Sequence, residues 1–98
     1  MTIEIKKTDA AIVIEVAGRL DTTTAPALDK TIAEDISANS NLILDLKGLE
    51  YISSAGLRVL LSAQKRMQKK GSMKLKNVCE EVMEVFEMTG FADILEIE

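Results

Sequence analysis

The stretch LDLKGLEYISSAGLRVLL, Leu44–Leu61, decides the fold because it contains the junction between a strand and a helix. The nearly continuous apolar run NLILDLKG, residues 41–48, is typical of a strand covered on both faces. After Ser53 and Ser54, apolar side chains recur at helical spacing and predict a helix from about Ser54 to Lys70. One serine hydroxyl suffices to cap that helix by accepting a hydrogen bond from an unpaired backbone N–H. We expect Ser53 to be the cap, which leaves the hydroxyl of Ser54 free.

The residues before this junction predict a hairpin and a helix. Alternating apolar residues in TIEIKK and AAIVIEVAG predict two antiparallel strands, joined by a turn at residues 7–9, with the second ending at Gly18. The segment DTTTAPALDKTIAEDISAN predicts a helix whose apolar stripe contains Leu28, Ile32 and Ile36.

After the long helix, we expect a strand in SMKLKN, a helix in CEEVMEVFEMTG and a last short strand in DILEIE. The predicted order is β-β-α-β-α-β-α-β in a single α/β domain, residues 1–98. Strand–helix–strand units imply parallel pairing with right-handed crossovers. We therefore expect a four- or five-stranded mixed sheet with three main helices, mainly on one face.

Composition excludes several functions. A net charge of −4 and three aromatic residues disfavour nucleic-acid binding and attachment to anionic membranes. With no histidine and one cysteine, neither a His- or Cys-based metal site nor an activated nucleophile is expected, so we predict a protein that is not an enzyme and needs no cofactor. No apolar run approaches ~18 residues and the N-terminus lacks a signal-peptide layout, so a cytoplasmic protein is expected.

Charge is segregated along the second half of the chain. Every charged residue from Arg58 to Lys76 is basic, and every one from Glu80 to Glu98 is acidic. Two solvated faces that attract each other within the fold would explain this pattern, and we favour that interpretation. An oriented surface for docking a partner is the alternative.

Ser54 is the main site candidate. It lies where a strand ends and a helix begins, a place where open α/β sheets bind ligands and where helix N–H groups favour a phosphate. Gly56 costs up to ~1 kcal/mol relative to alanine in a first helical turn, so something requires the missing side chain. Close backbone packing and close approach of a partner both explain it, and the sequence does not choose between them.

Three other residues are weaker candidates. Asp21 follows the second strand and is expected to be a turn or capping residue. Asp45 lies within the third strand, where an ionised carboxylate needs a partner. A phosphoacceptor role for it is disfavoured because the first strand lacks paired carboxylates that would hold Mg²⁺. Cys79 is interpreted as a small residue tolerated at a helix start.

Three segments, GRLDTTTAPAL, LILDLKGLEYISSAGLRVLL and NVCEEVMEVFEMTGFADIL, together resemble the STAS domain family, in particular bacterial anti-sigma factor antagonists. In that family a serine in an Asp-Ser-[Ser/Thr/Ala]-Gly-type loop is phosphorylated by a partner anti-sigma factor that is also a serine kinase. The resemblance implies that the unphosphorylated form binds this kinase and frees the sigma factor, and that a metal-dependent serine phosphatase resets the switch.

By this resemblance Ser54 is the phosphorylated residue. Ser53 stands where many family members have aspartate, and it is a second candidate acceptor. The residues expected to bind the partner are Asp21, Ser53, Ser54, Ala55, Gly56 and Arg58.

A phosphorylation-switched binding module is the leading hypothesis. A small-ligand module for a nucleotide or anion, and an unmodified structural subunit of a signalling complex, are the alternatives. The sequence leaves open whether the protein is a monomer or a weak dimer.

Overall fold

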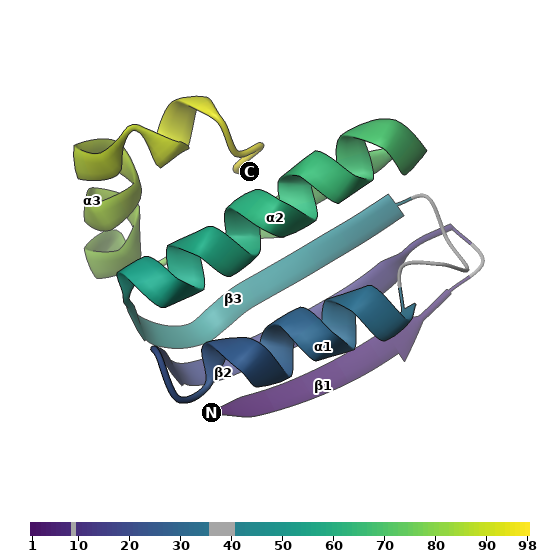
Figure 1. Cartoon of the computed structure of the whole chain (residues 1–98), viewed down its shortest axis with the longest axis horizontal. Helices are drawn as coiled ribbons and strands as arrows, with labels where there is room; N and C mark the ends of the chain where they lie inside the picture. The colour runs from purple at the N-terminus through teal and green to yellow at the C-terminus, as the bar shows by residue number, and fades with distance from the viewer. Residues whose placement is uncertain (9, 36–40) are drawn as a thin grey trace.

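The computed structural model of the chain describes residues 1–8, 10–35 and 41–98. The strands are β1 (Thr2–Lys7), β2 (Ile12–Leu20), β3 (Asn41–Ile52) and β4 (Ser72–Lys76). The helices are α1 (Ala25–Asp35), α2 (Ser54–Lys70), α3 (Glu80–Thr89) and the short 3₁₀ helix η2 (Phe91–Asp93). This arrangement confirms the predicted α/β class, and α2 has the bounds that the sequence predicted (Figure 1). The predictions for Asp9, Ile36 and Asn39 lie outside the described residues.

The four strands form one mixed sheet in the order β1-β2-β3-β4. β1 and β2 are antiparallel, because only a short turn joins them, whereas β3 and β4 each run parallel to the preceding strand. The crossovers contain α1 and α2, and both helices lie on the same face of the sheet (Figure 1). The carboxyl ends of β2 and β3 therefore lie at one edge, next to the starts of these two helices.

The core lies between the sheet and these helices. Ile14, Leu44, Leu60 and Phe86 have no exposed surface, and they come from β2, β3, α2 and α3. Buried and more exposed residues alternate along β3, so only one face of the strand is covered. The prediction of a strand covered on both faces was wrong, because the helices of both crossovers lie on one side.

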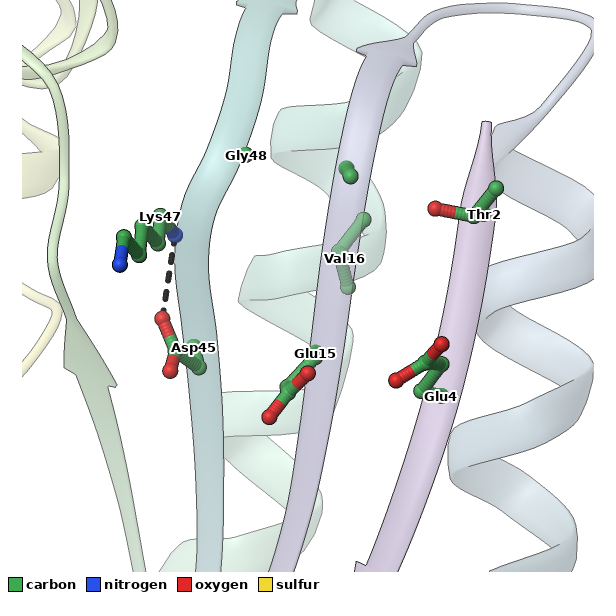
Figure 2. Close-up of a pocket in the computed structure, with 8 residues that line it drawn as sticks. Thr2, Glu4, Glu15, Val16, Asp45, Lys47 and Gly48 are labelled. Carbon is green, nitrogen blue, oxygen red and sulfur yellow. Dashed lines mark hydrogen bonds between the residues drawn. The ribbon is translucent and has the colours of Figure 1, made fainter.

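The opposite face of the sheet is open and carries polar side chains. Glu4, Glu15 and Asp45 form a row across β1, β2 and β3 beside a hollow of about 590 Å³ (Figure 2). Lys6 Nζ lies 2.8 Å from Glu15 Oε1, so one carboxylate of the row is paired within the fold. Ser53 and Ser54 do not line this hollow.

Two predicted strand ends differ from the structure. β2 does not end at Gly18, because that residue adopts a φ of 97° at a register irregularity and the strand continues to Leu20. The predicted last strand is reduced to one parallel bridge between Leu75 and Ile97. Helical turns occupy the chain as far as Leu95, whose N–H donates to Phe91 O at 2.9 Å, so only the last residues can pair.

Candidate functional site

The two serines at the end of β3 have different environments. Ser53 is the N-cap of α2, in extended backbone conformation, and its hydroxyl accepts a hydrogen bond from the Gly56 N–H at 3.4 Å. The Ser53 N–H donates to Leu20 O at 2.9 Å, which ties the end of β3 to the end of β2. The predicted capping role of Ser53 is therefore confirmed.

Ser54 is the first residue of α2, and it is exposed. In the part of the chain that the structure describes, its hydroxyl makes no hydrogen bond. The first turn of α2 contains no acidic residue, so no side chain of that turn offsets the positive end of the helix dipole. Arg58, one turn further on, is also exposed. The structure thus places a hydroxyl that no described residue binds at a helix end that favours negative charge.

Gly56 is required for packing. A Cβ atom on Gly56 would lie 2.7 Å from Leu20 Cγ and 2.8 Å from Ile52 Cγ1, distances that real side chains do not adopt. Leu20 and Ile52 are both buried. Of the two explanations for the glycine, this geometry supports close packing, because the empty Cβ position points into the core. A contact of Gly56 with a partner stays a prediction. Ala55 is half-buried and also packs against the core.

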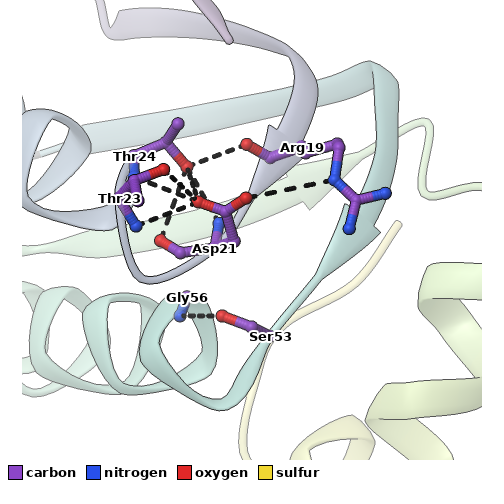
Figure 3. A network of polar contacts seen from close by, with 6 residues as sticks. All are labelled: Arg19, Asp21, Thr23, Thr24, Ser53 and Gly56. Atoms are coloured by element: carbon purple, nitrogen blue, oxygen red, sulfur yellow. Dashed lines mark hydrogen bonds and ion pairs between the residues drawn. The ribbon is translucent and has the colours of Figure 1, made fainter.

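Asp21 forms the turn that leads from β2 into α1, as predicted (Figure 3). Its Oδ1 accepts hydrogen bonds from the Thr23 N–H at 3.0 Å, the Thr23 hydroxyl at 2.7 Å and the Thr24 N–H at 3.2 Å. The hydrogen bond from the Thr23 hydroxyl is the main cause that lowers the pKa of Asp21. Thr24 Oγ1 donates to Arg19 O at 2.8 Å and accepts from the Asp21 N–H at 2.8 Å. This network holds an ionised carboxylate at the same edge of the sheet as Ser53.

A contact between Arg19 and Tyr51 at this edge was not predicted. The Arg19 guanidinium carbon lies 4.1 Å from the centre of the Tyr51 ring, and Arg19 Nε is 3.9 Å from Asp21 Oδ2. Tyr51 keeps 41% of its surface exposed. Register irregularities in β2 bring these two residues opposite each other, and no pattern in the sequence signals them. Tyrosine and arginine are enriched among residues that dominate binding at protein interfaces.

Asp45 and Cys79 are explained by contacts within the fold. Asp45 Oδ1 accepts hydrogen bonds from Asn77 Nδ2 at 3.0 Å and from the Lys47 N–H at 3.1 Å, and the bond from Asn77 is the main cause that lowers its pKa. Eight residues of extended chain, about 26 Å, separate Asp45 from Ser53. Cys79 begins α3 without capping it, and its thiol donates to Leu49 O at 3.3 Å.

The basic and acidic blocks meet at the end of the chain. Lys74 Nζ and Lys76 Nζ lie 3.5 and 3.7 Å from the Glu98 carboxylate oxygens. This contact agrees with the interpretation that the two blocks attract each other within the fold.

Among residues 1–8, 10–35 and 41–98, no three or more His, Cys, Asp or Glu side chains are grouped so that they could hold a metal ion. Within the same ranges, no helix combines the length and the apolar character needed to cross a membrane.

The fold and the site define a class of protein. The family model described as "STAS domain" matches residues 2–98, and the chain belongs to this family. Among its relatives is the anti-sigma-B factor antagonist of Bacillus subtilis (strain 168), which is 31% identical over 98 residues that cover 99% of this chain and 90% of that protein.

Solved structures show the same fold. An anti-sigma factor antagonist from Mycobacterium paratuberculosis superposes with a TM-score of 0.89 at 24% identity, over 98% of this chain and 83% of that one. The antagonist SpoIIAA in its unphosphorylated form gives 0.84 at 21% identity, over 99% and 88% of the two chains. Bacillus SpoIIAA in its phosphorylated form gives 0.77 at 20% identity, over 99% and 91%. At these identities the structures establish the fold alone.

Proposed function

We propose that this protein is an anti-sigma factor antagonist that binds a kinase-type anti-sigma factor and is released from it when Ser54 is phosphorylated. The observation that carries the proposal is that the Ser54 hydroxyl, at the start of α2 and directly after the capping residue Ser53, is exposed and makes no hydrogen bond to any described residue. The anti-sigma factor antagonists among the relatives, and the existence of a phosphorylated form of SpoIIAA, support it.

The two serines favour Ser54 as the phosphorylated residue. The Ser53 hydroxyl accepts the Gly56 N–H, so a phosphoryl group on that oxygen would disturb the cap. The Ser54 hydroxyl has no such role among the described residues, so it can be modified without disturbing the helix. Ser53 is the second candidate.

In the proposed reaction this protein is the substrate of its partner. Ser54 Oγ loses its proton and forms a bond to the γ-phosphorus of a nucleoside triphosphate, and the nucleoside diphosphate leaves. A metal-dependent serine phosphatase would then hydrolyse the phosphoester and restore the hydroxyl. We place this cycle in the cytoplasm.

Phosphorylation would act on binding through charge. The phosphoryl group brings about −2 of charge at pH 7 to a surface that includes Asp21, Ser53, Ala55 and Arg58. In the complex this charge must lose its hydration or meet like charge on the partner, and either effect weakens binding. The fold itself changes little because Ser54 is exposed. The unphosphorylated protein is therefore the form that binds and frees the sigma factor.

Three variants test the proposal. Ser54→Ala should bind the cognate anti-sigma factor and resist phosphorylation, and Ser54→Asp should bind it more weakly. Ser53→Ala is the matched control, and it should still gain one phosphate, measured by intact mass after incubation with the anti-sigma factor and ATP. Stoichiometric phosphorylation of Ser54→Ala would identify Ser53 as the acceptor. A wild-type protein that binds no kinase-type anti-sigma factor of its host would refute the proposed function.

A further inference from the structure

Arg58 differs from the other two arginines of the chain. Arg19 Nε lies 3.9 Å from Asp21, and Arg66 Nη1 lies 3.9 Å from Asp29. Arg58 is exposed, and among residues 1–8, 10–35 and 41–98 no carboxylate forms an ion pair with it. Among the residues that the structure describes, the fold thus holds this arginine side chain in water without an acidic partner.

Ser54 lies on the same face of α2 as Arg58. The two residues are four positions apart, which places their side chains one above the other, about 6 Å apart along the helix axis. Side chains in a helix lean towards its N-terminus, so Arg58 covers the turn on which Ser54 lies. The first turn of α2 contains no acidic residue that could compete for the guanidinium.

We propose that Arg58 is the internal counter-ion of phosphorylated Ser54. This inference rests on the proposed phosphorylation of that serine. The guanidinium would donate two N–H groups to two phosphate oxygens, a geometry that arginine forms readily with phosphate. In the unmodified protein Ser54 has a neutral hydroxyl, so Arg58 remains available to the partner.

The pairing adds a second component to the switch. Phosphorylation introduces negative charge at Ser54. It also draws Arg58, one of the residues expected to bind the partner, into an ion pair within α2. The partner therefore loses its contact with Arg58 at the moment when it meets the phosphate. The same ion pair stabilises the first turn of α2 in the phosphorylated form.

The test places phosphoserine at position 54 by genetic incorporation, so that no kinase is needed. The second ionisation of the phosphate is followed by ³¹P NMR titration in low salt, with Arg58 present and in the variant Arg58→Gln. We expect a phosphate pKa about 0.3 unit lower when Arg58 is present, which is about a twofold difference in the dissociation constant. The helix dipole acts on the phosphate equally in both proteins and cancels.

Lys65→Gln is the matched control. It removes one exposed positive charge from the same helix, but about 16 Å from Ser54 along the axis. Its effect on the phosphate pKa should be less than a third of that of Arg58→Gln, because Coulomb attraction falls with distance and Lys65 lies far beyond hydrogen-bond reach of the phosphate. Arg58→Lys should retain part of the shift, since it keeps the charge but loses the two-pronged geometry.

Equal shifts in Arg58→Gln and Lys65→Gln would overturn the pairing. A lower phosphate pKa with Arg58 present, combined with no phosphorylation of Ser54 by any anti-sigma factor of the host, would refute the proposed function and leave the pairing intact. The two ideas can therefore fail separately.

Discussion

Replacement of Gly56 by alanine tests how the start of α2 packs on the sheet. The added Cβ would lie 2.7 Å from Leu20 Cγ, 2.8 Å from Ile52 Cγ1 and 3.0 Å from Leu20 Cδ2. Both neighbours are core residues with at most 4% of their surface exposed, so they have little room to move. Overpacking of this kind costs about 1–3 kcal/mol, whereas the better helix propensity of alanine returns up to ~1 kcal/mol. We therefore expect Gly56→Ala to lower the free energy of unfolding by about 1–2 kcal/mol.

Urea and thermal denaturation followed by circular dichroism measure this effect. For a domain of this size each kcal/mol lowers Tm by about 4–8 °C. Ser62→Ala is the matched control, because it changes helix propensity in α2 at a half-exposed position and should stabilise by at most ~0.5 kcal/mol. In a Leu20→Ala background, which removes the closest contacts, Gly56→Ala should cost at least ~1 kcal/mol less than in the wild type.

Two results would refute this reasoning. If Gly56→Ala stabilised the protein as Ser62→Ala does, the clash with Leu20 and Ile52 would not exist in solution. If Gly56→Ala left stability unchanged but abolished binding to an anti-sigma factor, the glycine would serve the approach of the partner and not the packing of the core.

Three further predictions follow from single contacts. Ser53→Ala should lower the free energy of unfolding by ~0.5 kcal/mol in urea denaturation, which is at the low end for a helix cap because the hydrogen bond to Gly56 is long at 3.4 Å. Ser53→Asp should lower it less, since aspartate can also cap a helix, and equal losses in the two variants would argue against capping. Hydrogen bonds hold the pKa of Asp21 in the folded protein below its value in the unfolded chain. The ionised carboxylate therefore stabilises the fold above about pH 4, and this stabilisation is lost as the pH falls through the folded-state pKa. In Asp21→Asn the free energy of unfolding should therefore decline less steeply as the pH is lowered below about 4. An unchanged pH dependence in this range would contradict the prediction. Gln64 Oε1 is buried without a hydrogen-bond partner among the described residues, so Gln64→Met should raise the free energy of unfolding by ~1 kcal/mol, whereas a lower Tm would show that the oxygen is satisfied.

Most of the fold could be predicted because its signals are local. The bounds of α2 depend on a capping serine, on helical spacing of apolar residues and on a glycine at the end, all within one segment. The end of β2 and the last strand were harder, because Gly18 can either end a strand or continue it through a left-handed conformation. Apolar and polar residues alternate in residues 93–98 as they do in a strand. The first of these residues, however, belong to helical turns that begin at Phe91.

The candidate site was predictable in part for the same reason. That Ser53 caps α2 and leaves Ser54 free follows from the geometry of any helix start, which involves residues at most four positions apart. The contact of Arg19 with Tyr51 could not be predicted, because it depends on the register between two strands separated by a whole crossover.

The sequence by itself determined the order of strands and helices as far as α3, the junction after β3 and the two serines that stand there. Only the tertiary structure decided why Gly56 is a glycine, since Leu20 and Ile52 reach it from the ends of two neighbouring strands. It also decided that one face of the sheet stays open and that Arg58 is left without an acidic partner among the described residues. Local patterns depend on backbone geometry within a few residues, whereas packing and charge pairing depend on which distant segments the fold brings together.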